Sequence, residues 1–519
     1  MKRSGFLIFG VVTLCTATVF ASGTAQADQW TDSGPVQGGT VATLPATSAF
    51  VSINAGEDFN AAVGDNGHVY TWGSNSHGRL GNNATTQSHT PIDISATGAL
   101  SGVSVTSITT GPVAEHAIAL GSNHHVYAWG ENSDGQVGNG TTVDSGIPVD
   151  VSESGALTGI TVVGAATGAN HTLAVGSNGH VYAWGENGAG ELGNNSTVAS
   201  TVPVDISATG ILSGISVREV SAGPGFSMAV SSNGHVYTWG LNVNGQLGDN
   251  SVTDSHVPID VSASGALNGV SIAAISAGAN HAMALSEAGD IYTWGNNSEG
   301  QLGDNSTTDS HVPVAVATSG VLAGIVLHAI AAGSGFSTAV GENGHTYTWG
   351  MNAGGELGDG TTTARLVPVD ISANGGLGGV SIAAVDASLA LDVGGKVYAW
   401  GLNAAGEIGD GSTVDSLVPT LSAHFVPTAV TFDGLPGSAL TYTAESVTVT
   451  TPAHPAGVVS VQTTESVFGG TASTTFSASK TYANSFTYLS SPTPPPTTGT
   501  STPNPGTPAP IDHLPVVSG

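Results

Sequence analysis

Histidines are the side chains in this sequence whose type and spacing come closest to predicting chemistry. Five of them share one recurrent turn position, where Asp290 and Lys396 also occur: His68, His125, His180, His235 and His345. Imidazole is a common zinc ligand and titrates near neutral pH, so the set suggests a metal site or a pH sensor. Metal ligands must converge on one ion, whereas equivalent positions of successive repeats are held apart. We therefore predict a belt of solvated histidines.

A second histidine position is shared with phenylalanine. It is occupied, in chain order, by Phe59, His116, His171, Phe226, His281 and Phe336. Phenylalanine neither binds metals nor titrates, so the exchange favours a packing role for this position. The histidine ring nitrogens are then expected to bond backbone groups.

Acidic turns offer oxygen ligands for a weak calcium site. They begin at Asp249, Asp304 and Asp410, each followed by Asn or Gly and then Ser. The Asp-x-Asp-x-Asp-Gly spacing with a bidentate Glu is absent, and Asx-turns account for these residues. The expectation is no cofactor, with weak Ca²⁺ binding as the alternative.

Motifs for catalysis are missing from the sequence. It has no Gly-x-Ser-x-Gly elbow, no His-Glu-x-x-His and no phosphate-binding Gly-x-x-x-x-Gly-Lys. Glu57 with Asp58, or Glu115, could serve as a carboxylate pair, but acidic loop residues are common and nothing sets these apart. We expect no enzymatic activity, and a polysaccharide-active enzyme is the alternative.

The N-terminus has the layout of a secretory signal peptide. Lys2 and Arg3 precede an apolar run at 6–21, and Ala25-Gln26-Ala27 offers a small-residue cleavage site. Residues 1–27 are therefore predicted to be removed, which implies a secreted or cell-surface protein. The only cysteine lies in this segment, so disulfides and thiolate chemistry are not expected.

The predicted mature chain is strongly acidic. Without Lys2 and Arg3 it has five basic residues against 37 acidic ones, a net charge of −32. Affinity for nucleic acid and for anionic lipid comes from Lys and Arg, so neither partner is expected. No second apolar stretch reaches membrane-spanning length, and a protein without membrane insertion, in monomeric form, is predicted.

These residues are set in a repeat of about 55 residues. Periods of this length indicate a repeat array. Within each unit, alternating apolar residues flank Asn-Gly and related turns, which predicts about four short hairpin strands. Four strands make one propeller blade, so the predicted fold class is all-β, a seven-bladed propeller. Trp-Gly recurs with spacings of 57, 55, 55, 55, 55 and 51 residues, at Trp72-Gly73, Trp129-Gly130, Trp184-Gly185, Trp239-Gly240, Trp294-Gly295, Trp349-Gly350 and Trp400-Gly401.

The units resemble the RCC1 repeat, whose pattern is Gly-x-x-His, Ala-Leu, Gly-x-Val-Tyr-x-Trp-Gly-x-Asn-x-x-Gly-Gln-Leu-Gly and a later Val-Pro. Gly278 with His281, and the run 245–248, carry the match within roughly residues 35 to 425. The resemblance implies an RCC1-like propeller of a secreted bacterial type. Unit two departs from the pattern by extra residues around Pro112 to Glu115, and unit seven is shortened at Val385 to Leu391.

The tryptophans and tyrosines of the repeat could form a sugar-binding platform. Their single recurrent position and β-alternation instead predict a core role, which leaves few aromatic residues for a groove. Pro35 to Asn54 is expected to complete a blade begun near the C-terminal end of the array, because a closed ring removes sheet edges.

The Trp-Gly pattern ends at Phe425. Residues 426–489 hold alternating strand segments that resemble the IPT/TIG immunoglobulin-like domain, which implies a small β-sandwich. The Pro/Thr-rich tail at 490–519 cannot form a core. The predicted domains are a signal peptide at 1–27, a propeller at 28–425, this sandwich and the tail.

The predicted function is a secreted, non-enzymatic binding or adhesion module whose propeller loops engage an extracellular protein or a cell-wall component. The resemblance also implies guanine-nucleotide exchange, which export and acidity oppose, and inhibition of a β-lactamase is a further alternative. Binding sites in a propeller are expected where the repeat symmetry is broken. The binding-face positions predicted in this way are Arg79, Glu115, Arg218, Arg365 and Lys396.

Overall fold

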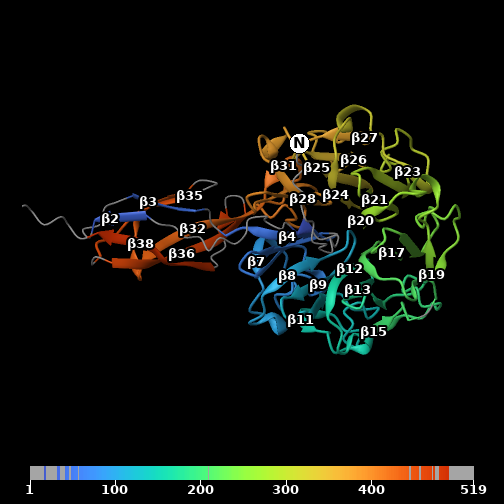
Figure 1. Ribbon diagram of the computed structural model, residues 1–519, viewed down its shortest axis with the longest axis horizontal. Helices are drawn as coiled ribbons and strands as arrows, with labels where there is room; N and C mark the ends of the chain where they lie inside the picture. The colour runs from blue at the N-terminus through green and yellow to red at the C-terminus, as the bar shows by residue number, and fades with distance from the viewer. Residues whose placement is uncertain are drawn as a thin grey trace, which may run out of the picture.

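The chain folds into a ring of β-sheets, with a group of further strands projecting from one side (Figure 1). Most of the predicted signal peptide, Glu57 and the tail at 490–519 lie outside the described residues. In the computed structural model these residues are 17–18, 32–35, 41–45, 48–56, 58–208, 210–442, 446–454, 457–469, 472–473 and 478–489.

Seven antiparallel sheets form the ring, and each blade contains four consecutive strands. We call them a to d from the ring axis outward, because the a strands of successive blades contact one another. Blades one to three contain β4 (Phe50–Ala55), β5 (Phe59–Gly64), β6 (Val69–Gly73) and β7 (Ser88–Asp93); β8 (Val105–Thr109), β9 (His116–Gly121), β10 (Val126–Gly130) and β11 (Ser145–Asp150); and β12 (Val162–Thr167), β13 (His171–Gly176), β14 (Val181–Gly185) and β15 (Ser200–Asp205). Blades four to seven contain β16 (Val217–Ala222), β17 (Phe226–Ser231), β18 (Val236–Gly240) and β19 (Ser255–Asp260); β20 (Ile272–Ala277), β21 (His281–Ser286), β22 (Ile291–Gly295) and β23 (Ser310–Ala315); β24 (Leu327–Ala332), β25 (Phe336–Gly341), β26 (Thr346–Gly350) and β27 (Arg365–Asp370); and β28 (Ile382–Asp386), β29 (Leu389–Asp392), β30 (Val397–Gly401) and β31 (Ser416–Leu421).

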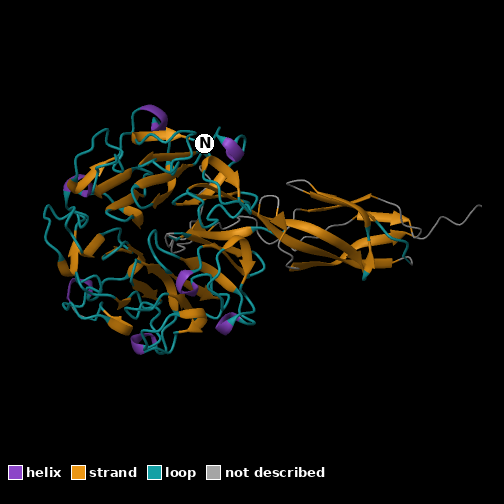
Figure 2. Ribbon diagram, turned by 180° about the vertical axis from the view of Figure 1, so that it is seen from behind, coloured by secondary structure: helices purple, strands orange, loops and turns teal. Residues whose placement is uncertain are grey.

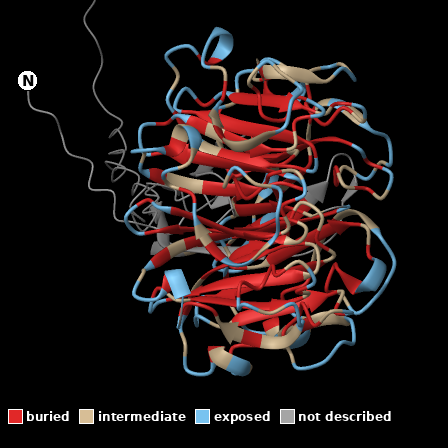
Figure 3. Ribbon diagram, turned by 90° about the vertical axis from the view of Figure 1, so that its right-hand side faces the viewer, coloured by how far each residue is buried: buried red, intermediate tan, exposed pale blue. Residues whose placement is uncertain are grey.

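Antiparallel pairing gives the ring two distinct faces. The loops between strands a and b and between strands c and d lie on one face, which we call the ab/cd face. The bc turns and the links to the next blade lie on the other, the bc face, and the links contain short 3-10 turns such as η5 (Gly265–Leu267) (Figure 2). The inner strands a to c are mostly buried, whereas the outer d strands and the loops are more exposed (Figure 3).

The seven repeat tryptophans lie in the core, with exposed fractions of 0 or 1%. Each indole Nε1 donates a hydrogen bond of 2.7 to 2.9 Å to a backbone carbonyl in the cd loop of the preceding blade. The last of these bonds runs from Trp72 to Glu407, at 2.8 Å, and joins blade one to blade seven. The Trp-Gly repeat therefore links neighbouring blades as well as filling their interiors.

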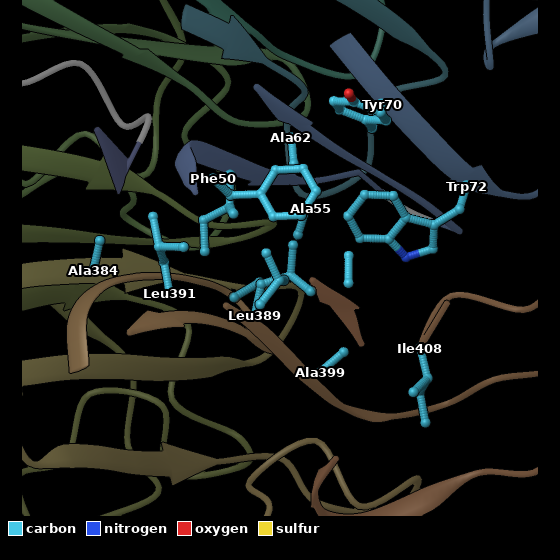
Figure 4. Close-up of a cluster of buried hydrophobic side chains, with 14 of the residues drawn as sticks. Phe50, Ala55, Ala62, Tyr70, Trp72, Ala384, Leu389, Leu391, Ala399 and Ile408 are labelled. Atoms are coloured by element: carbon cyan, nitrogen blue, oxygen red, sulfur yellow. The ribbon is translucent and has the colours of Figure 1, made fainter. Parts of the chain in front are cut away.

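The ring closes without a shared sheet, which corrects the prediction that Pro35 to Asn54 completes a blade. Blade one and blade seven each contain four of their own consecutive strands, and β1 (Ala17–Thr18) adds to β4. Closure depends on packing between Phe50 and Trp72 of blade one and Leu389 and Ile408 of blade seven (Figure 4). The Trp72 bond repeats the indole bond made between all other blades, whereas the packing of Phe50 on Tyr70 and Phe425 is particular to this contact.

The predicted propeller segment also needs a correction at its N-terminal end. β2 (Asp32–Pro35) pairs in parallel with β38 (Ala478–Leu489), and β3 (Val41–Pro45) pairs with β35 (Ser446–Thr450). Both early strands thus belong to the C-terminal sheets. These have the orders β2-β38-β36-β32-β33 and β3-β35-β34, with β37 paired to β36, and contain β32 (Ala423–Phe432), β33 (Leu435–Pro436), β34 (Ser438–Tyr442), β36 (Gly457–Gly469) and β37 (Ala472–Ser473).

Helices are few in this fold. In the described part of the chain, none has the length and apolar character needed to cross a membrane.

Candidate functional site

The ab/cd face is nearly symmetric, and its two main irregularities are the ab loops of blades two and seven. In blades one to six the residue after Trp-Gly donates its N–H to an ab-loop carbonyl, as Met351 does to Gly335 at 2.9 Å. In blade seven the bond runs from the Trp400 N–H to the Ser388 carbonyl at 3.2 Å. The ab loop of blade seven is therefore too short to cover the Trp-Gly pair.

The Trp-Gly glycines show the consequence of this shortening. In blades one to six, a Cβ atom on the glycine would lie 2.3 to 2.7 Å from a backbone oxygen of the ab loop. At Gly401 the nearest atom is the Cα of Glu356, at 3.5 Å. Blade seven thus leaves open a space that the ab loop fills in every other blade.

The long ab loop of blade two extends toward a blade that is not its neighbour. The Pro112 carbonyl accepts a hydrogen bond of 3.4 Å from the Ser334 Oγ of blade six. Pro112 also lines a small axial cavity, together with Thr110 and Asp386 at the ends of a strands. The insertion therefore covers the axis of the ring on this face.

A pocket of about 130 Å³ opens where these two irregularities meet. Pro112 of the long loop and Ala387 and Ser388 of the short loop all line it. The other lining residues come from blades one, six and seven: Ala55, Gly56, Asp58, Phe59, Asn60, Gly333, Ser334, Phe336, Met351, Glu356, Gly401, Leu402 and Glu407.

Among the described residues, three carboxylates line the pocket, and no Lys, Arg or His does. The Oε2 atom of Glu356 accepts the Gly354 N–H, and Oε2 of Glu407 accepts the Ala405 N–H, both at 2.8 Å. Glu356 is 8% exposed, whereas Asp58 is exposed to solvent. Burial raises the pKa of Glu407, and the nearby Asp58 carboxylate raises it further. The pocket is acidic and can attract a cation.

Comparison with known proteins agrees with this architecture. The RCC1-like domain model matches residues 97–443, and models of the regulator of chromosome condensation (RCC1) repeat match residues 66–120 and 50–79. The chain belongs to the RCC1-like domain family. Ultraviolet-B receptor UVR8 of Arabidopsis thaliana is 35% identical to it over 311 residues, covering 59% of this chain and 67% of UVR8.

Two further proteins resemble part of this RCC1-like chain. E3 ubiquitin-protein ligase HERC2 of Homo sapiens is 32% identical over 325 residues, which is 62% of this chain but 6% of HERC2. The crystal structure of human WBSCR16 has a TM-score of 0.60 at 21% identity and covers 74% of this chain and 99% of its own. This last likeness concerns the fold alone.

Two of the five predicted binding-face positions of the RCC1-like propeller come together, as an ion pair. The Nη2 atom of Arg79, in the cd loop of blade one, lies 2.7 Å from Oε2 of Glu115, in the long loop of blade two. Arg79 is only 2% exposed and stands where blades two, four and five have Gln. Its charge is therefore used to hold the insertion in place.

The surroundings of this ion pair do not fit a metal ion. Ligand atoms of His77, Glu115 and Glu131 lie within 4.8 Å of one another. However, Arg79 already neutralises Glu115, and the hydrogen bond to Asp144 raises the pKa of His77. The Arg79 guanidinium repels a cation, and the raised pKa of His77 favours the protonated imidazole, which has no free nitrogen for a metal.

The other three predicted positions lie apart from each other and from the pocket. Arg218, on β16, donates from Nη2 to the Ile272 and Ala273 carbonyls of blade five at 2.5 and 2.8 Å. Arg365, on the d strand of blade six, pairs with Asp359 at 2.6 Å. Lys396 lies in the bc turn of blade seven, on the opposite face.

The belt histidines each pair with an aspartate on the d strand of their own blade. Their Nδ1–Oδ2 distances are 2.6 to 3.1 Å, in the pairs His68–Asp93, His125–Asp150, His180–Asp205, His235–Asp260 and His345–Asp370. Blade five, which has Asp290 in place of the histidine, has Ala315 in place of the aspartate. A constant spacing of 25 residues was the sequence signal for these pairs.

The buried histidines bond hydroxyl groups of the next blade through Nε2, where backbone partners were predicted, and His116 also interacts with the Ala169 backbone. Their Nε2 atoms lie 2.8 to 3.0 Å from Thr172, Ser227 and Ser337. Each hydroxyl in turn donates to a cd-loop carbonyl, so Nε2 carries the ring proton. Hydroxyls meet the rings because the adjacent backbone groups already bond within the sheets.

The acidic turns use their carboxylates locally, as predicted for Asx-turns. Oδ1 of Asp249, Asp304 and Asp410 accepts the N–H of the serine two residues later at 2.8 to 3.0 Å. These bonds account for the acidic residues without an ion.

Proposed function

We propose that this RCC1-like chain is a non-enzymatic binding module whose partner protein docks on the ab/cd face, at the pocket between blades six, seven and one. One observation carries the proposal. The two irregular ab loops, in blades two and seven, meet at this pocket and nowhere else among the described pockets. Function in a symmetric propeller is expected where the symmetry is broken.

The residues that line the pocket favour binding over catalysis. The Glu356 and Glu407 carboxylates are held by backbone N–H groups of their own loops, and no histidine is present to act as a base. Apolar side chains such as Met351 and Leu402 form much of the wall. A shaped, partly apolar pocket with fixed polar groups is typical of a recognition site.

The proposal places this module outside the cell. Its basis is the N-terminal segment 1–27, with the layout of a signal peptide, and the acidic composition of the chain. We take the C-terminal sheets as an IPT/TIG-like sandwich that displays the propeller, and the partner as an extracellular protein or cell-wall component. Nucleic acid remains excluded from the proposal by the scarcity of Lys and Arg.

The test is capture of partners by the immobilised full chain from secreted and cell-surface fractions. Leu402→Arg should abolish capture, because Leu402 is 54% exposed in the pocket wall and arginine would occupy the pocket. Val393→Arg makes the same change at a 69% exposed position on the bc face and should leave capture intact. Equal capture by both variants would contradict the proposal.

A further inference from the structure

We infer that the pocket on the ab/cd face receives the cationic side chain, Lys or Arg, of the partner protein. The inference rests on the proposed function, which supplies the partner protein. The acidic lining of the pocket is the reason why the bound side chain is expected to be cationic. Asp58, Glu356 and Glu407 bring three carboxylates to the pocket, which has no cationic side chain in its lining.

The pocket carboxylates have no ion-pair partner in the described part of the chain. The ion pairs found there engage other acids, such as Glu115 and Asp359. Burial and the Asp58 charge both raise the pKa of Glu407, as expected where negative charge is in excess. An incoming cation would relieve this repulsion in a site that is screened less than open water.

The pocket walls suit the stem of such a side chain. Phe336 is 5% exposed, Met351 is half-buried and Leu402 is exposed, so an apolar path leads to the carboxylates. Lysine and arginine cover apolar surface with their methylene groups while the charged head binds elsewhere. The volume of 130 Å³ far exceeds the roughly 10–15 Å³ that one water requires.

Other blades show that the fold does not require these negative charges. At the position of Glu356 and Glu407, blades two, four and five have Gln136, Gln246 and Gln301. Each glutamine Oε1 accepts the same backbone N–H at 2.8 to 2.9 Å. An amide oxygen therefore satisfies the loop N–H as well as a carboxylate oxygen does, so this hydrogen bond does not require the negative charge of Glu356 or Glu407.

The experiment is a titration of the full chain, labelled with ¹³C-methyl methionine, with Nα-acetyl-arginine amide and Nα-acetyl-lysine amide. Met351 lines the pocket, whereas Met228 and Met283 are fully buried in other blades and serve as internal controls. We expect only the Met351 methyl signal to shift. Nα-acetyl-citrulline amide, a neutral isostere of the arginine compound, should bind about tenfold more weakly or worse.

A double variant provides the second arm. Glu356→Gln with Glu407→Gln reproduces the residues of other blades, so we expect an unchanged melting temperature and about tenfold weaker binding of both cations. Glu191→Gln makes the same change in blade three, away from the pocket, and should bind like the unmodified chain.

Three results would overturn the inference: a Met351 signal that ignores both cations, equal binding of the citrulline compound, or full binding by the double variant. Each can occur while the chain still captures a partner that Leu402→Arg loses, which leaves the proposed function intact. Conversely, cation binding without capture of any partner would refute only the proposed function.

Discussion

At the scale of single residues, two acidic side chains inside the ring serve as hydrogen-bond acceptors between blades. Oε1 of Glu219 accepts the Ile275 N–H at 3.2 Å, and Oδ2 of Asp386 accepts the Ala55 N–H at 3.1 Å. Burial raises the pKa of Glu219 to about 8 and that of Asp386 well above its ordinary value. These two carboxyl groups thus join the inner strands of neighbouring sheets, in surroundings that favour their neutral form.

Glu219→Gln should stabilise the protein at alkaline pH. The folded pKa of Glu219 lies above that of the unfolded chain, so the unfolded state binds fewer protons between about pH 4.5 and 8, and stability falls as pH rises through this window. Glutamine keeps the Ile275 bond without that loss. We expect a gain of about 1–3 kcal/mol at pH 8 and almost none at pH 4.5 in urea denaturation. A gain that is independent of pH would contradict this explanation.

The His68–Asp93 pair should stabilise blade one only at mildly acidic pH. The hydrogen bond to Asp93 raises the pKa of His68, so its contribution is lost as pH rises through the folded pKa. Burial opposes ionisation of Asp93, but hydrogen bonds from His68 and Ser95 outweigh burial and lower its pKa, so its contribution is lost as pH falls through that value. The pair is effective between these limits.

Asp93→Asn should therefore lower the free energy of unfolding most near pH 5 to 6. His68 is 43% exposed, and solvent screening limits the expected loss to less than about 1 kcal/mol. Unfolding free energies of both proteins across pH 3 to 9 provide the measurement. A difference that stays constant over this range would show that the charges contribute nothing.

At the scale of elements, the contact between neighbouring blades is one motif used seven times. The Trp indole, the a-strand acceptors and a two-blade hydrophobic cluster recur around the ring. The contact between blades seven and one follows this pattern too, since no strand is exchanged there. The closing contact is therefore expected to be as strong as the others.

Trp72→Phe and Trp239→Phe should destabilise the ring by similar amounts. Both indoles are fully buried and donate to a carbonyl of the preceding blade at 2.8 and 2.7 Å. Loss of the bond and of ring volume should cost about 2–4 kcal/mol in each case. Thermal unfolding measured by circular dichroism compares the two variants. A much larger loss for Trp72→Phe would indicate that closure depends on a special contact.

At the scale of the whole molecule, the N-terminal segment joins the C-terminal sheets. β2 and β3 pair with β38 and β35, although more than 400 residues separate the paired strands. The ring lies between these segments in sequence, and the Ser48 N–H bonds Oε2 of Glu465 at 3.0 Å where they meet. The strands of the C-terminal sheets thus lie both before and after the propeller in the sequence.

Deletion of residues 28–47 should loosen the C-terminal sheets and spare the ring. It removes one of the two partner strands of β38 and of β35, while every propeller blade keeps its own four strands. Hydrogen exchange should therefore rise in β35 and β38 and stay unchanged in strands such as β17 and β21. Faster exchange throughout the ring would show that the early strands also hold the propeller together.

Local patterns were sufficient to predict much of this molecule. Strand alternation, Asn-Gly turns and the Trp-Gly period predicted four-stranded blades. The hydrogen bonds of the Asp249 turn were also predictable, because they involve only residues close to it in the sequence. The candidate site was only half predictable. The insertion at Pro112 and the short segment near Ser388 were visible as irregular units, but their meeting depends on where blades two and seven lie in the ring.

The sequence by itself determined the repeating unit and the number of blades, because strand pairing within a blade involves neighbours along the chain. Only the tertiary structure decided which residues from different repeats face each other. It placed Arg79 against Glu115, gathered Asp58, Glu356 and Glu407 around one pocket, and paired β2 with β38. These contacts arise from the packing of blades side by side, from the closure of the ring and from the pairing of residues 32–35 and 41–45 with the C-terminal sheets, and no local pattern encodes them.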